Sequence, residues 1–287
     1  MGEADVGFRS KLCTFFGLDR STPYKRRIRP TRDAVLAAQI KAVTTEHPHY
    51  GHRRIAIELD TSKNRVRRVM RAAGLPSPTR KKRYTKANKG TRPAPPNLLK
   101  PGGGSEALVA THPGHIWAAD FTYLWFDNRF YYLATVIDVC TRQIVGWALG
   151  THHNDQLITD ALMDGVSHHS PPSILRNDRG SEYISKHYQT ICASLEIAMS
   201  ASAPGAPWEN GFQESFYNNF KWELDADHLN RLNNPGQLLE AIAIQLNYYN
   251  TKRIHTALKT NPAAYAARFE QQSSTEVRDK VMTVSGT

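Results

Sequence analysis

Three runs of aromatic and β-branched residues, separated only by short turns, constrain the fold of this chain most strongly. They cover residues 117–126, 130–139 and 143–149. The polar segments 127–129 and 141–142 between them have the composition of tight turns. Runs of this kind joined by such turns are typical of an antiparallel meander. We therefore expect three consecutive strands, each paired with its neighbour.

The residues after this meander alternate between helical and extended patterns. The expected helices cover 154–167, 185–195, 208–229 and 235–249, and the expected strands cover 174–177 and 197–200. A meander followed by alternating helices and strands gives one mixed sheet with helices packed against it. For residues 108–270 we therefore predict an α/β body: a ribonuclease-H-like five-stranded mixed sheet flanked by helices.

Three carboxylates occupy positions that this topology brings together. Asp120 lies in the first strand, Asp178 directly follows the fourth strand, and Glu214 lies early on a helix, with 35 residues between Asp178 and Glu214. Because the first strand is central and the fourth lies beside it, the two aspartates should face each other while the glutamate reaches in from a packed helix. A lone Asp is more often a turn or surface residue, but three that converge favour a metal site. Such oxygen ligands suit two Mg²⁺ ions, with Mn²⁺ as a substitute, and phosphoryl transfer.

The charge is divided unevenly along the chain. Residues 1–104 carry 24 Lys and Arg against 7 Asp and Glu, whereas residues 105–287 carry 13 against 19. A basic arm joined to a mildly acidic body indicates that the arm binds a polyanion such as DNA. A merely solvated basic tail is the alternative, but the apolar periodicity within the arm argues against it.

Residues 31–76 have the pattern of an all-α, helix-turn-helix-like DNA-binding domain. Short helices are predicted over 33–46, 53–59 and 65–73, and Gly74 ends the last one. An ordinary solvated helical face is the alternative interpretation of its arginines. The side chains that we expect to contact DNA are Arg53, Arg54, Arg65, Arg67, Arg68 and Arg71. Such contacts would be mostly to phosphates and therefore sensitive to salt.

The remaining segments are assigned from composition. Residues 1–30 are expected to form an N-terminal helical segment, 77–107 a basic linker rich in Pro and Gly, and 271–287 a C-terminal tail. The linker contains a basic cluster that we also expect to contact DNA, formed by Arg80, Lys81, Lys82 and Arg83. We expect no membrane span and no secretory signal. The three widely spaced cysteines fit neither a disulfide framework nor a zinc site, which favours the cytoplasm.

Several motifs occur in a fixed order around these acids. Asp120 lies in Trp-x-x-Asp-x-Thr, Asp178 in Asn-Asp-Arg-Gly-Ser, and Glu214 in Asn-Gly-x-x-Glu-Ser-Phe. Lys-x-Glu at 221–223 and Tyr-Asn-x-x-Arg-x-His at 249–255 follow. With the 35-residue spacing, the chain resembles the DDE transposase and retroviral-integrase catalytic core superfamily, specifically bacterial insertion-sequence transposases of the OrfB type. It departs from the family pattern at Asn177, Glu182 and Gly211, where the family has Ser, Gln and Ala.

The resemblance implies a DNA transposase that cleaves the ends of its element and transfers the exposed 3′-OH into DNA. It implies Asp120, Asp178 and Glu214 as catalytic metal ligands. Lys221 and Asn210 share a helix face with Glu214 and are expected to contact DNA, whereas Arg253 and His255 should tie the last helix to the body. The implied partners are DNA, further copies of the chain on that DNA, and an OrfA protein or fused OrfA segment. The implied location is the bacterial nucleoid.

Two rival functions remain open on the sequence alone. One is a metal-dependent nuclease of the same fold that cuts DNA without joining it. The other is a transposase-derived DNA-binding regulator with an idle core, against which the intact set of three acids argues.

Overall fold

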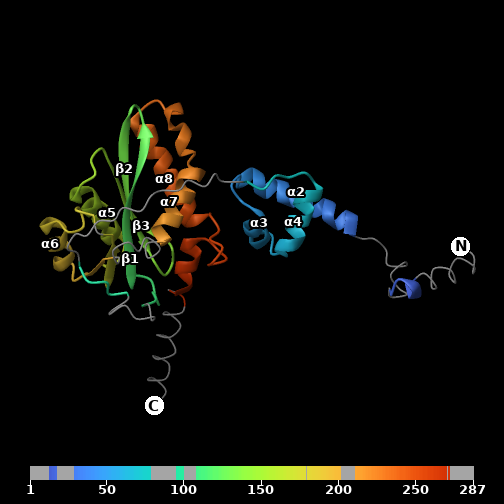
Figure 1. Ribbon diagram of the computed structural model, residues 1–287, viewed down its shortest axis with the longest axis horizontal. Helices are drawn as coiled ribbons and strands as arrows, with labels where there is room; N and C mark the ends of the chain where they lie inside the picture. The colour runs from blue at the N-terminus through green and yellow to red at the C-terminus, as the bar shows by residue number, and fades with distance from the viewer. Residues whose placement is uncertain are drawn as a thin grey trace, which may run out of the picture. The chain divides into compact units, whose positions relative to one another are not determined.

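The computed structural model divides the chain into two compact units, residues 1–78 and 79–287 (Figure 1). The structure describes residues 13–17, 29–78, 95–99, 108–178, 180–201, 211–269 and 271. Most of the expected N-terminal segment and C-terminal tail, the basic cluster at 80–83 and Asn210 lie outside the described residues. None of the described helices combines the length and apolar character needed to cross a bilayer.

Within residues 29–78 of the N-terminal unit, three helices pack around a small apolar core. They are α2 (Arg29–Glu46), α3 (His52–Glu58) and α4 (Lys63–Ala72). The three helices contact one another, and their buried apolar side chains include Leu36 and Ile40 of α2, Ile55 of α3, and Val66 and Val69 of α4. Gly74 follows the C-cap Ala73 with a φ of +64°, the left-handed conformation that commonly ends a helix. The three predicted helices are therefore confirmed, with α2 starting earlier than expected.

The second unit contains the predicted five-stranded mixed sheet, in the order β3-β2-β1-β4-β5. The strands are β1 (Ile116–Phe126), β2 (Arg129–Asp138), β3 (Ile144–Gly150), β4 (Ile174–Asn177) and β5 (Ala198–Ala201). β1, β2 and β3 form the antiparallel meander, whereas β4 runs parallel to β1, and β5 parallel to β4. The first hairpin turns at Asp127 and Asn128, both with positive φ, so Arg129 already belongs to β2 rather than to the turn.

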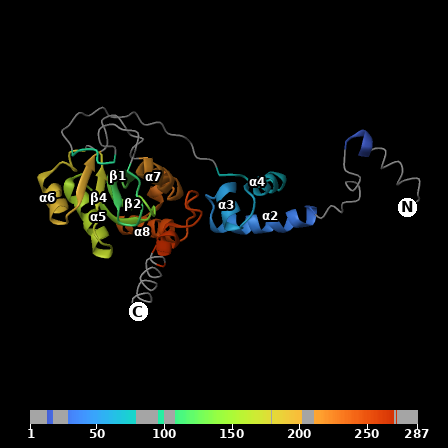
Figure 2. The same cartoon turned by 90° about the horizontal axis from the view of Figure 1, so that it is seen from below.

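Helices cover both faces of this sheet, as the two views in Figures 1 and 2 show. One face packs against α5 (Asp155–His168) and α6 (Lys186–Ser194), and the other against α7 (Gly211–Glu223) and α8 (Pro235–Thr251). Successive side chains of a strand point to opposite faces. In β1, Trp117 and Ala119 therefore belong to the core under α5, and Ala118 and Leu124 to the core under α7. This alternation assigns Asp120 to the face covered by α7.

The helix ends agree with the sequence patterns except after α7. Asn154 caps α5 as predicted, because its side chain accepts a hydrogen bond from the Leu157 N–H at 3.1 Å. The helix expected over 208–229 is too long: α7 ends at Glu223, and a separate 3-10 helix follows (Ala226–Arg231). Asp225 between them has φ +58° and ψ +49°, a left-handed conformation through which an α-helix does not continue.

The segment after α8 is fixed to the body through Arg253, as the sequence predicted. Its Nε donates to the Glu223 carboxylate at 2.7 and 2.8 Å, and Glu223 belongs to the last turn of α7. The backbone of His255 pairs with Thr260 in the same segment, and its expected tie to the body stays a prediction. Two elements that are distant in sequence are thus joined by a buried ion pair.

Candidate active site

Asp120 and Asp178 lie at the same edge of the sheet because of the register of β1 and β4. These parallel strands pair Ala118 with Arg176, and each aspartate follows two residues after its member of that pair. Carboxyl ends of adjacent parallel strands are where ligand sites gather in sheets of this kind. The structure therefore places the two aspartates opposite each other, as the sequence predicted from topology.

The carboxyl group of Asp120 lies in an environment that disfavours its charge. Its Oδ1 accepts a hydrogen bond from the Phe121 N–H at 2.8 Å, which favours the ionised form. Burial has the opposite and larger effect, because it disfavours the charged carboxylate. The negative charge of Asp178 acts in the same direction as burial, as do the smaller effects of Glu182 and Glu214, and together they raise the pKa of Asp120 to about 8. The charges of Asp178, Glu182 and Glu214 thus all act on the carboxyl group of Asp120.

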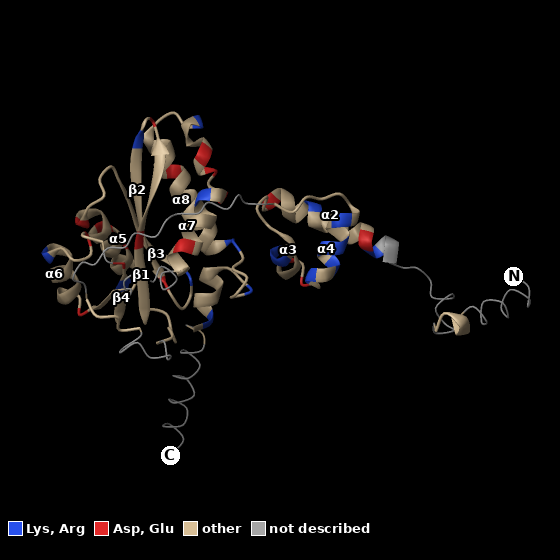
Figure 3. Cartoon of the chain, viewed as in Figure 1, with Lys and Arg blue, Asp and Glu red and all other residues tan. Residues whose placement is uncertain are grey.

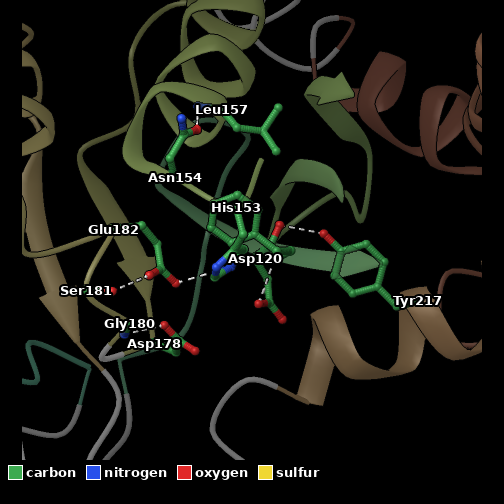
Figure 4. A network of polar contacts seen from close by, with 10 residues as sticks. Asp120, His153, Asn154, Leu157, Asp178, Gly180, Ser181, Glu182 and Tyr217 are labelled. Carbon is green, nitrogen blue, oxygen red and sulfur yellow. Dashed lines mark hydrogen bonds and ion pairs between the residues drawn. The ribbon is translucent and has the colours of Figure 1, made fainter. Parts of the chain in front are cut away.

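Asp178 opens the turn that follows β4. Its Oδ1 accepts a hydrogen bond from the Gly180 N–H at 2.7 Å, an arrangement that fixes the carboxylate within its own turn. Burial raises the pKa of Asp178 and so does the charge of Glu182, whereas the Gly180 hydrogen bond and His153 lower it. Figure 4 shows the side chains of Asp120, Asp178 and Glu182 in the same part of the site, with the ring of His153 beside them.

Glu182 and His153 form a pair at this site that the sequence did not reveal. The Nε2 of His153 lies 3.6 Å from Oε1 of Glu182, and the Ser181 hydroxyl donates to Oε2 at 3.1 Å. A Cβ on Gly180 would meet the Glu182 carboxylate, so that carboxylate would have to move if another residue stood there. Glu182 had a sequence signal, its place four residues after Asp178, but His153, just before the cap of α5, had none.

Helix α7 is held against the strand that carries Asp120. Gln213 is fully buried, and its Nε2 donates to the backbone carbonyls of Ala118 at 2.6 Å and Thr135 at 3.2 Å. One turn later, the Tyr217 hydroxyl donates to the backbone carbonyl of Asp120 at 2.5 Å. These bonds fix the start of α7, and with it the backbone of Glu214, relative to β1. The available signal was a polar residue, Gln213, on the otherwise aromatic inner face of the helix.

The candidate ligand atoms are of the type that binds a divalent cation. All candidate ligands are carboxylate oxygens, and their mutual repulsion at Asp120 is what a bound cation would relieve. The side chain of Glu214 is exposed, and it reaches Asp120 only through its electrostatic effect. Within the described ranges, no three His, Cys, Asp or Glu side chains are grouped closely enough to hold one ion. The structure thus brings two of the three acids together and places the third nearby.

Lys221 lies two turns after Glu214 on α7. Its Nζ sits 4.3 Å from the centre of the Tyr123 ring, a cation–π contact with the first hairpin. Its proposed contact with DNA stays a prediction, and so does that of Asn210, which lies outside the described residues. What the structure adds is that the cation of Lys221 is held beside an aromatic side chain of β1.

The arginines of the N-terminal unit divide into two groups. Figure 3 shows Lys and Arg gathered on α3 and α4. Arg68 binds Asp33 of α2 through two hydrogen bonds of 2.7 and 3.0 Å, and Arg65 donates to the Arg32 carbonyl at 3.4 Å. The Arg68 hydrogen bond lowers the pKa of Asp33. Arg65 and Arg68 therefore join α4 to α2, and Arg53, Arg67 and Arg71, which like Arg68 are exposed, remain the expected DNA contacts.

This division leads to different expectations for two arginines on the same helix. Arg67→Ala should weaken DNA binding and reduce the slope of log Kd against log salt by about one, because one phosphate contact is lost. Arg68→Ala should chiefly lower the melting temperature of the N-terminal unit, and only slightly, since exposed ion pairs contribute about 0.2–1 kcal/mol. Salt titrations of DNA binding and thermal unfolding of both variants measure this. A larger salt effect for Arg68→Ala than for Arg67→Ala would contradict the assignment.

Family comparisons match both units. Two integrase core domain models match residues 110–207 and 195–262, and an HTH-like domain model matches residues 30–83. The second unit therefore corresponds to an integrase core, and the first to an HTH-like domain.

Individual proteins similar to this chain come from insertion sequences. The transposase for insertion sequence element IS904 of Lactococcus lactis is 34% identical over 235 residues, covering 78% of this chain and 90% of that protein. The IS600 uncharacterized 31 kDa protein of Shigella sonnei is 29% identical over 279 residues, covering 92% and 100%. Among solved structures, the HTLV-2 integrase catalytic core domain in complex with magnesium aligns with a TM-score of 0.47 and 21% identity, over 54% of this chain and 97% of that one.

Proposed function

This chain belongs to the insertion-sequence transposases with an integrase core domain, and we propose that it cleaves DNA at the ends of its element and joins the exposed 3′-OH to a second DNA. The observation that carries this proposal is the register of β1 and β4, which sets Asp120 opposite Asp178. The effect of the Glu214 charge on the pKa of Asp120 supports Glu214 as the third acid of the site.

We propose Asp120, Asp178 and Glu214 as the ligands of two Mg²⁺ ions, with Mn²⁺ as a substitute. When bound, such ions activate the attacking oxygen and stabilise the leaving oxygen of a phosphodiester. In cleavage the oxygen of water bonds to phosphorus and the 3′-oxygen leaves as a 3′-OH. In joining, that 3′-oxygen loses its proton and bonds to the phosphorus of a second phosphodiester, whose own 3′-oxygen leaves as a hydroxyl. Neither step needs a covalent bond to the protein.

The other residues of the site would position these acids rather than react. Gln213 and Tyr217 hold α7 against β1 at the carbonyls of Ala118 and Asp120, which keeps the strand and helix from separating. Glu182, with His153 and Ser181, shapes the turn that begins at Asp178. A site held by such contacts loses little free energy to reorganisation when DNA arrives.

The partners follow from the same reaction. We propose that the N-terminal unit binds DNA through the exposed arginines of α3 and α4, and that copies of the chain assemble on the two ends of an element. We further propose that an OrfA protein or fused segment takes part, and that the complex works on DNA at the bacterial nucleoid. The basic charge of residues 1–104 supports the first of these proposals.

A strand-transfer assay tests the proposed function. The wild-type chain is mixed with a short duplex that ends in a pre-cut 3′-OH taken from the end of the element, with a supercoiled plasmid, and with Mg²⁺ or Mn²⁺. We expect plasmid joined covalently to the duplex, detected by a label on the duplex. Nicking without joining would instead indicate a nuclease of this fold. Binding with neither reaction would indicate a DNA-binding regulator.

A further inference from the structure

Three aromatic side chains on the outer face of the first hairpin lie open to solvent. Tyr123, Trp125 and Phe130 are 56%, 46% and 45% exposed. Phe130 contacts both others, with ring centroids 5.5 Å from Tyr123 and 4.7 Å from Trp125, and it is the register partner of Trp125. We call these three residues the hairpin platform. Their neighbours on the opposite face, Leu124 and Phe126, are buried in the core under α7.

The hairpin platform continues towards the acids through further rings. Tyr132, the register partner of Tyr123, lies with its ring centroid 5.5 Å from that of His153, and Phe121 lies 4.5 Å from His153. His153 in turn contacts Glu182 at the candidate site. Because a strand rises about 3.3 Å per residue, Tyr123 and Trp125 lie about 10 and 17 Å along β1 from Asp120, with their side chains on the other face of the strand. That range equals roughly three to five stacked bases at 3.4 Å each.

A cation accompanies these rings. Lys221 of α7 places its Nζ 4.3 Å from the centre of the Tyr123 ring. β1 pairs with β4 only as far as Ala118, so nothing in the described part of the sheet pairs with that edge of β1 beyond it. Open rings next to a positive charge are the combination by which proteins bind nucleic acid strands whose bases are unpaired.

We propose that the hairpin platform stacks against unpaired bases of the DNA strand that adjoins the phosphate at Asp120. This proposal rests on the proposed function, because it takes DNA at the acids as given. It adds a binding site on β1 and β2 and a preference for DNA whose end is locally unpaired. Tyr123, Trp125 and Phe130 supply the stacking faces, and Lys221 lies where it meets the backbone of the same strand.

A second copy of the chain fits this surface less well. Fully burying an aromatic side chain removes about 150–250 Å² from water, so three half-exposed rings offer roughly 300 Å². A stable protein interface uses about 800 Å² on each partner. The surface is also aromatic rather than aliphatic and includes a cation, which favours stacked bases over a protein partner.

Fluorescence binding measurements test the proposal on the full-length chain. The probes are a blunt duplex and the same duplex with a short unpaired extension that contains 2-aminopurine. We expect the wild type to prefer the extended duplex and to quench the 2-aminopurine, because the base stacks. The double variant Trp125→Ala, Phe130→Ala should lose roughly tenfold or more in affinity for the extended duplex and almost nothing for the blunt one. Trp125→Phe should keep most of the affinity.

The controls separate stacking from general damage and from the proposed chemistry. Ile244→Ala removes an apolar side chain of α8 that is 62% exposed, and it should leave both affinities unchanged. An equal loss on both duplexes, no loss on either, or a variant that only weakens self-association in sedimentation would overturn the proposal. Binding is read without cleavage, so an inactive wild type would refute the proposed function and leave this result standing.

Discussion

Replacing Asp120 by Asn is expected to abolish cleavage and joining while making the metal-free protein more stable. The activity is lost because an amide oxygen carries no charge to hold a divalent cation opposite Asp178. Metal ions contribute several kcal/mol to phosphoryl transfer, so the rate should fall by about a thousandfold or more. Asp178→Asn and Glu214→Gln should show losses of similar size in the strand-transfer assay.

The gain in stability follows from the raised pKa of Asp120. The pKa of this group is about 8 in the folded chain against 3.8 for the reference group, so the folded state binds more protons between these values. The free energy of unfolding therefore falls as the pH rises between these two pKa values. Above pH 8 the full free-energy cost of ionising the buried Asp120 is present. Asn does not ionise and escapes this cost. The melting temperature of Asp120→Asn in EDTA should exceed that of the wild type by an amount that grows from pH 5 to pH 8.

An exposed acid on α5 supplies the control for both measurements. Asp160 on α5 is exposed and accepts a hydrogen bond from Gln156, away from the four acids. Asp160→Asn removes the same charge and should change neither the activity nor the pH dependence of the melting temperature. If Asp120→Asn keeps activity within tenfold of the wild type, the assignment of this residue as a ligand is wrong.

The sheet and the two aspartates were predictable because their signals are local. Turn residues such as Asp127 and Asn128 fix the hairpin, and the order of strands then places Asp178 next to Asp120. The end of α7 was not predictable in this way. It depends on the left-handed conformation of Asp225, whose carboxylate binds Arg231 and His228, and the apolar pattern continues past that point.

Contacts between distant segments account for the residues that the sequence did not reveal. In the sequence Gln213 is only a polar residue on an aromatic helix face, and its role depends on the bond from its amide to the Ala118 carbonyl, 95 residues away. In the same way Arg68 has the spacing of an outward arginine, and only the packing of α2 brings Asp33 to it. Helical periodicity states which face is polar, but it does not state what lies opposite that face.

Breaking the Glu223–Arg253 ion pair should cause a large loss of stability, well beyond that expected for an exposed ion pair. The two side chains are only 3% and 2% exposed, and Gln245 also donates to Glu223 at 3.3 Å. Arg253→Met leaves the carboxylate buried without its cation, which costs about 3–5 kcal/mol. At about 2–4 °C for each kcal/mol, the melting temperature should fall by roughly 10 °C. Scanning calorimetry of the wild type and the variant measures this directly.

A matched ion pair on the surface distinguishes burial from pairing alone. Arg231 binds Asp225 at 2.6 Å, as closely as Arg253 binds Glu223, but its side chain is 57% exposed. Arg231→Met should therefore cost less than about 1 kcal/mol. The double variant Glu223→Leu, Arg253→Met removes both charges and should recover much of the loss. Equal losses for Arg231→Met and Arg253→Met would show that burial of the inner pair contributes little. Because Glu223 ends the helix that carries Glu214, Arg253→Met should also lower strand transfer, and the double variant should restore part of it.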